Sequence, residues 1–114
     1  MKESIIKIKS FEFALQIIGL YSFLLEKKEY VLSKQLLRCG TSIGANVNEA
    51  LAGESRADFV HKMSIASKEA RETLYWLELL EKSKMVAADY SLYIMNCTDI
   101  VKILTSIVKT TKSS

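Results

Sequence analysis

A catalytic site or a metal site in this sequence would have to use its single histidine, His61. Asp58-x-x-His61 has the spacing of the ligand pairs in di-iron helical bundles, but such a site needs two Glu-x-x-His pairs and two further carboxylates. Nucleophilic catalysis needs a nucleophile, a base and an orienting group within reach. His61 would have to be the base, yet helical spacing places it opposite the apolar Phe59 and Met63. The sequence therefore predicts no catalytic residue, no metal site and no cofactor.

Two lines of polar residues offer a different kind of site. The first line, in the segment 31–52, has spacings of four, four, four and three: Lys34, Arg38, Ser42, Asn46 and Glu49. The second line is mixed and lies beside an apolar stripe in the next segment: Asp58, Lys62, Ile65, Glu69, Glu72 and Trp76. One interpretation is structural, because the two lines can bond to each other and fix the register of two helices, or simply face solvent.

The alternative interpretation of these lines is a recognition surface for phosphates or for an acidic partner. Its cations are Lys34, Arg38, Lys62, Lys68 and Arg71, and cations of this kind bind phosphate oxygens by charge-assisted hydrogen bonds. Glu69 and Glu72 argue against it, because they would repel phosphate from the same neighbourhood. The residues alone leave both interpretations open.

Local signals indicate where helices begin and end. Ser55 to Asp58 resembles a capping box, in which the Ser55 hydroxyl accepts an early backbone N–H and Asp58 reaches back. Asp58 and Lys62, four residues apart with the acid first, form a favourable pair. Gly53 can adopt a left-handed conformation just past a helix end, and Asp89 is a suitable N-cap for a last helix.

Other conspicuous residues have simple packing explanations. Gly40 and Gly44 are four residues apart in a helical segment, which lets a neighbouring helix approach closely. Cys39 and Cys97 sit among apolar or small residues, as reduced buried thiols do. Tyr75 and Trp76 stand among leucines and the acids Glu72 and Glu78, so we expect them to pack against another helix or subunit rather than to stack on a nucleobase.

The elements that must position these residues are helical. The 114 residues contain no proline and four glycines, too few turn formers for a sandwich or barrel. Apolar residues recur at helical spacing in four segments, which predicts helices over about 4–27, 31–52, 55–82 and 89–110. Short connections between them predict one domain, 1–114, folded as an all-α, antiparallel up-down-up-down four-helix bundle.

The first and last segments are more apolar than a lone bundle needs. In the first segment the core stripe is predicted at Ala14, Ile17, Ile18, Tyr21, Leu24 and Leu25, which leaves Ile5, Ile6, Ile8, Phe11, Phe13, Leu20 and Phe23 in surplus. Surplus apolar surface on a small domain indicates a partner surface, and self-association is the simplest explanation. The most apolar stretch, Phe11 to Leu25, is interrupted by Glu12 and Gln16. It falls short of the roughly 18 uncharged residues that a membrane-spanning helix needs. We therefore expect a cytoplasmic protein with no membrane partner.

Three long motifs resemble one protein family. They are Arg38–Ala50 (RCGTSIGANVNEA), Glu54–Phe59 (ESRADF) and Lys68–Leu80 (KEARETLYWLELL). Together they are similar to the four helix bundle protein family, also called 23S ribosomal RNA intervening-sequence proteins. Cys39 stands where that family usually has Ser, and Asn48 where Glu is usual; neither change affects the expected fold.

The resemblance implies an antiparallel bundle that assembles as a homopentamer, in bacteria, without known enzymatic activity or cofactor. A related group is similar to the accessory proteins of diversity-generating retroelements, which associate with a reverse transcriptase and with nucleic acid. The formal net charge of +3 per chain would give a pentamer about +15.

These observations favour a non-enzymatic, homo-oligomeric scaffold or adaptor that works around RNA, DNA or a nucleic-acid enzyme. The alternative is a purely protein-binding module. Its contacts would be aromatic and aliphatic, for example Phe11, Phe13, Phe23, Tyr90 and Tyr93. Salt distinguishes the two, since phosphate contacts weaken as salt rises and apolar contacts do not.

Overall fold

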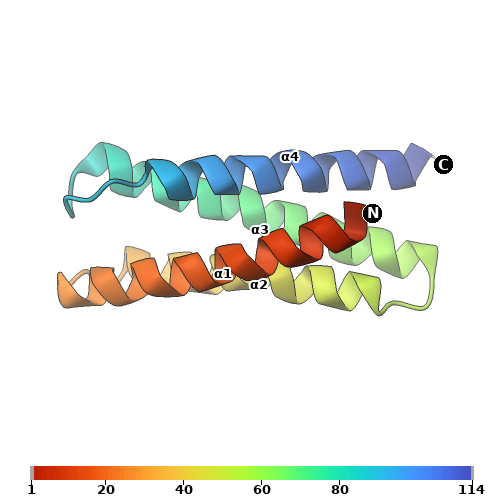
Figure 1. The fold of residues 1–114 in the computed structure, drawn as a ribbon, viewed down its shortest axis with the longest axis horizontal. Coiled ribbons are helices and arrows are strands. Elements are labelled where there is room, and N and C mark those ends of the chain that lie inside the picture. Colours follow the sequence, from red (N-terminus) through yellow and green to blue (C-terminus); the bar gives the residue numbers. More distant parts are fainter. Residues whose placement is uncertain (1, 114) are drawn as a thin grey trace.

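A computed structural model of the chain describes residues 2–113, and the side chains from residue 5. Four helices make up the fold: α1 (Lys2–Glu26), α2 (Leu32–Leu51), α3 (Arg56–Ser83) and α4 (Ser91–Ser113). Consecutive helices run in opposite directions and both termini lie at the same end (Figure 1). The predicted all-α four-helix bundle is confirmed, and each helix begins and ends within three residues of its predicted bounds.

The helices form a rod of 45 × 20 × 20 Å with one continuous core. Each helix contacts two neighbours, so that α1 and α3 lie diagonally across the bundle, as do α2 and α4. The core is filled mainly by branched aliphatic side chains with almost no exposure: Ile6, Ile17, Leu24, Leu36, Ile43, Val47, Leu77, Leu80, Ile100 and Leu104. This burial stabilises helices whose own propensity is modest.

The core face of α1 differs from the predicted one. Phe13 and Leu20, assigned to the surplus, are buried at 2% and 3% exposure, whereas Ile18, assigned to the core, is 47% exposed. The physical reason is that α1 carries large apolar residues on both its inner and its outer side, so its periodicity does not specify which side faces the core. In α4 the predicted stripe is buried at Cys97 and Leu104.

Helices α1 and α2 approach closely at the two glycines of α2. A Cβ on Gly40 would lie 2.9 Å from Cγ2 of Ile17, and a Cβ on Gly44 would lie 3.4 Å from the carbonyl oxygen of Ser10. The predicted close approach of a neighbouring helix is therefore present, and the neighbour is α1.

The connections do not use Gly53 as predicted. Gly53 has no positive φ; its backbone N–H donates to the carbonyl of Ala50. The left-handed positions of the described chain are instead Lys28, after α1, and Lys84, after α3. Gly53 is small for another reason: a Cβ there would lie 2.7 Å from Oδ2 of Asp58.

Polar side chains begin the helices. Ser55 caps α3, because its hydroxyl accepts from the backbone N–H of Asp58 at 3.1 Å, as the capping-box motif predicts. Before α4, the Asp89 carboxylate accepts from the backbone and the hydroxyl of Ser91, which lowers the pKa of Asp89. These bonds satisfy N–H groups that a helix leaves unpaired at its start.

Candidate functional site

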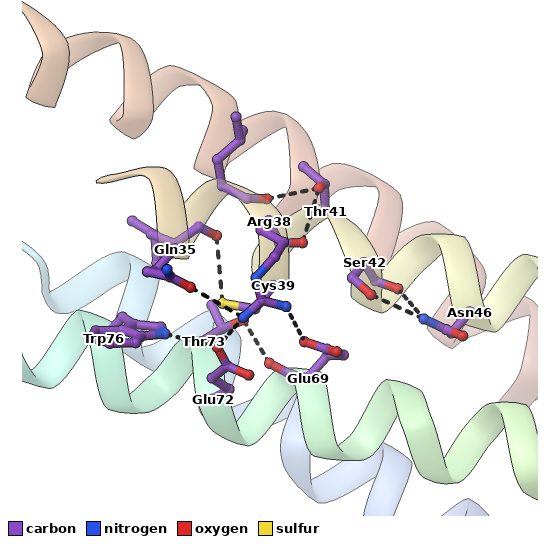
Figure 2. A network of polar contacts seen from close by, with 12 residues as sticks. Gln35, Arg38, Cys39, Thr41, Ser42, Asn46, Glu69, Glu72, Thr73 and Trp76 are labelled. Carbon is purple, nitrogen blue, oxygen red and sulfur yellow. Dashed lines mark hydrogen bonds and ion pairs between the residues drawn. The ribbon is translucent and has the colours of Figure 1, made fainter. Parts of the chain in front are cut away.

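The seam between α2 and α3 carries an ion-pair cluster around Arg38. Its guanidinium pairs with Glu69, with Nη1 to Oε2 at 3.5 Å, and with Glu72. Figure 2 shows Arg38 of α2 reaching across to both carboxylates of α3, with Gln35 beside it. Glu72 also accepts from Nε1 of Trp76 at 3.1 Å. The positive charge of Arg38 is therefore offset by two acids.

Lys62, farther along the same seam, is also paired. Its Nζ lies 2.9 Å from Oε1 of Glu49 on α2, so the close ion pair forms with Glu49, while the charge of Asp58 also favours the charged form of Lys62. The hydrogen bond and charge of Glu49 raise the pKa of Lys62.

The rest of the first polar line stays within α2. The Asn46 amide donates to the carbonyl and the hydroxyl of Ser42, at 2.9 and 3.1 Å (Figure 2). Lys34 is exposed on α2. Three members of the predicted cation surface thus lie on α2 or on its seam with α3, and two of those three are paired with carboxylates.

The other two predicted cations, Lys68 and Arg71, point elsewhere. Both are exposed on α3, and Nη2 of Arg71 donates to Oγ1 of Thr105 on α4 at 3.2 Å. The structure therefore divides the predicted set between two sides of α3. Lys34, Arg38 and Lys62 do not form one surface with Arg71.

Arg71 lies in a groove between α3 and α4 that also contains basic residues outside the predicted set of cations. One hollow of about 300 Å³ is lined by Ser64, Ser67, Arg71, Thr105, Val108, Lys109 and Lys112. An adjoining hollow is lined by Arg56, Ala57, Val60, His61, Ser64, Thr111 and Lys112. The spacing of four and three residues between Thr105, Lys109 and Lys112 puts them on one side of α4, and this pattern could have predicted the groove from the sequence.

The nucleophile candidates are inaccessible. Cys39 and Cys97 are fully buried, and the Cys97 thiol donates to the carbonyl of Ala70 at 3.3 Å. Burial raises the pKa of Cys97 to about 12 and raises that of Cys39 as well. Both therefore stay protonated thiols, which are poor nucleophiles. His61 is exposed, as its helical spacing predicts.

The outer face of α1 carries an apolar stripe, defined as Ile8, Phe11, Leu15 and Ile18. Their exposed fractions are 59%, 60%, 56% and 47%. The spacing of three, four and three residues keeps them on one side, opposite the core residues. Of the aromatic residues predicted for protein contact, Phe11 is exposed, whereas Phe13 and Tyr90 are buried in the core.

Helices α1 and α4 are apolar enough to meet the length and composition of a membrane span, over Ile5–Glu26 and Ser91–Ser113. The inner faces of both helices contribute to the bundle core, with Ile17 and Leu104 fully buried. A helix that is apolar all round is covered either by protein or by lipid, so composition by itself favours neither.

Comparison with known proteins places the chain. The family model of the 23S rRNA-intervening sequence protein matches residues 2–106. A crystal structure from Bacteroides thetaiotaomicron, described as a protein of unknown function from the S23 ribosomal protein family, is 52% identical. The match covers 96% of this chain and 99% of that one, with a TM-score of 0.90. No curated protein matches. The chain belongs to the 23S rRNA-intervening sequence protein family.

Proposed function

We propose that this protein is a non-enzymatic, self-associating helical scaffold of the cytoplasm. The observation that carries the proposal is the apolar stripe on α1, whose four large side chains are each about half exposed or more. Leaving such a contiguous patch in water is unfavourable by roughly 25 cal/mol per Å² of apolar surface. Patches of this kind on small soluble domains mark interaction sites.

A second copy of the chain is the occupant we propose. The stripe is flanked by a hollow of about 360 Å³ between α1 and α4, lined by Ile5, Lys102, Ile103 and Ser106. A protruding apolar residue such as Phe11 or Leu15 on one copy can enter the hollow on another. A contact between two different patches repeats around an axis and closes a ring when the rotation allows it. The resemblance to the family makes five the expected number of copies.

A lipid surface is the competing occupant. It is disfavoured because the exposed apolar residues of α1 alternate along the helix with Lys7, Lys9 and Glu12, all exposed, and because the inner face of α1 is committed to the core. The absence of enzymatic activity is supported by the buried, protonated state of both cysteines and by the exposed position of His61.

The mass of the purified protein tests the proposal. Multi-angle light scattering at micromolar concentration should give a multiple of 12.9 kDa, with five copies expected. The variant Phe11→Gln/Leu15→Gln should shift the mass towards one copy while its helical circular dichroism is kept. The matched control Tyr30→Gln/Met85→Gln removes two equally exposed hydrophobic residues, at 59% and 61%, from outside the stripe and should leave the mass unchanged.

Two results would contradict the proposal of a self-associating scaffold. One is a wild-type protein that stays at 12.9 kDa under these conditions. The other is flotation of the wild type, but not of the stripe variant, with neutral phosphatidylcholine vesicles, since that assigns the stripe to lipid.

A further inference from the structure

We propose that the groove between α3 and α4 binds the sugar-phosphate backbone of a single-stranded nucleic acid. The groove lies where the first half of α3 meets the second half of α4, away from the apolar stripe of α1. It does not require self-association, so it can succeed or fail independently of the scaffold.

Three of the cations that line this groove lack the acids that neutralise the other seam. Arg71, Lys109 and Lys112 are all exposed, and none lies within 4.0 Å of a carboxylate among residues 5–113. The Arg71 guanidinium donates to the neutral hydroxyl of Thr105. An Arg held in this way keeps its full charge and further N–H groups for a ligand.

The lining of the groove matches a phosphate backbone. Neither hollow is lined by an Asp or a Glu, whereas the hollow at the α2–α3 end is lined by Glu49, Glu54 and Asp58. Hydroxyl groups of Ser64 and Thr105 alternate with the cations, and both Arg or Lys and hydroxyl side chains bind phosphate oxygens. A polyanion is therefore attracted more strongly to this groove than to the hollow at the α2–α3 end.

The shape of the groove favours a single strand. The two hollows share Ser64 and Lys112, so they form one track from Arg71 to Arg56. Fifteen residues of α3 span about 22 Å, and packed helices are about 8–10 Å apart. A linear seam of this length can follow one strand, as basic channels for single strands do.

The turn of α3 that follows Arg71 carries an exposed aromatic residue, Tyr75, in contrast to the packing that the sequence predicts for it. Tyr75 follows Arg71 by one helical turn and is 57% exposed, and its ring meets Trp76 edge-on with centroids 5.4 Å apart. An exposed ring beside cations is the arrangement that stacks on nucleobases without sequence preference. Trp76 holds the ring in place, since its own indole N–H is bonded to Glu72.

Fluorescence anisotropy with labelled poly(U) and poly(dT) of about 16 nucleotides tests the groove. Each backbone contact to a single strand contributes about 0.7 to the salt slope. Loss of two contacts in Lys109→Gln/Lys112→Gln should therefore weaken binding about 25-fold near 0.1 M salt and reduce the slope by about 1.4. The control Lys28→Asn/Lys34→Gln removes the same charge from other exposed sites and should change affinity far less. Tyr75→Ala should weaken binding about fivefold or more.

Each outcome decides the proposal. Equal losses in the two charge variants would mean that net charge, not the groove, attracts the strand. Polyglutamate of equal charge that competes as well as poly(U) would assign the groove to an acidic protein and overturn the proposal. Binding of poly(U) but not poly(dT), or of both, supports it and tells whether the ribose hydroxyl takes part. Light scattering on the same samples reports self-association separately.

Discussion

Oε1 of Glu29 lies 2.6 Å from the backbone nitrogen of Ser33, in the first turn of α2. The other carboxylate oxygen accepts from the N–H groups of Val31 and Leu32, both at 3.1 Å, and the Ser33 hydroxyl donates to the Glu29 carbonyl at 2.7 Å. Val31 occupies the N-cap position without a capping side chain. One buried carboxylate therefore satisfies three helix N–H groups and places a negative charge at the positive end of the helix dipole.

Glu29→Ala should lower the free energy of unfolding by about 2 kcal/mol, because charged hydrogen bonds to a buried helix start are lost. Urea denaturation followed by circular dichroism measures the change. Glu54→Ala, which removes an exposed acid from the next connection, is the matched control and should change stability by less than about 0.5 kcal/mol. Equal stability of the two variants would show that Glu29 does not cap α2.

Gly40→Ala and Gly44→Ala should have opposite effects although both improve helix propensity by up to about 1 kcal/mol. A Cβ on Gly40 meets Cγ2 of Ile17 at 2.9 Å, and this β-branched side chain is stiff, so overpacking costs about 1–3 kcal/mol. A Cβ on Gly44 finds ordinary contacts from 3.4 Å outwards. Thermal unfolding should place Gly40→Ala below the wild type and Gly44→Ala at or above it. Because Ile17→Ala removes the clashing Cγ2, Gly40→Ala should cost less stability in the Ile17→Ala background than in the wild type.

The buried thiols predict a loss of stability in alkali. Burial raises the pKa of Cys97 from 9.0 to about 12. The unfolded chain releases this proton above pH 9 while the folded chain keeps it, so folding loses up to about 1.4 kcal/mol per pH unit for this group. The stabilising contribution is complete below about pH 9 and is lost between pH 9 and 12. Urea unfolding between pH 7 and about pH 10 should show this decline, and Cys97→Ala should flatten it; an unchanged slope in that variant would contradict the assignment.

Arg38→Gln should affect nucleic-acid binding far less than Arg71→Gln. Arg38 is paired with Glu69 and Glu72, so its charge is already offset, whereas Arg71 bonds a neutral hydroxyl. We expect about a fivefold weaker affinity for poly(U) in Arg71→Gln and less than twofold in Arg38→Gln. The Arg38 side chain is 52% exposed, so its pairs contribute no more than about 1 kcal/mol to stability. Equal losses of affinity in Arg38→Gln and Arg71→Gln would contradict this prediction and show that Arg38 also contacts the nucleic acid.

Several features of the fold could be predicted from the sequence because they depend on neighbours along the chain. Helix existence follows from the 3.6-residue periodicity of apolar residues, and the cap of Ser55 follows from a motif four residues long. The close approach at Gly40 and Gly44 follows from missing side chains. The buried position of Glu29 carried no such signal, since it stands after two lysines in a polar break.

Tertiary structure alone decided which groups meet across helices. In α1 large apolar residues lie on both the inner and the outer side, so only packing against α2 and α4 determined that Phe13 faces the core and Ile18 faces out. The partners of the cations were settled in the same way: Arg71 and Thr105 are 34 residues apart in the chain, as are Arg38 and Glu72. A sequence supplies the charges, but the electrostatic interaction of two charges depends on their separation in space, and that separation exists only once the helices have packed.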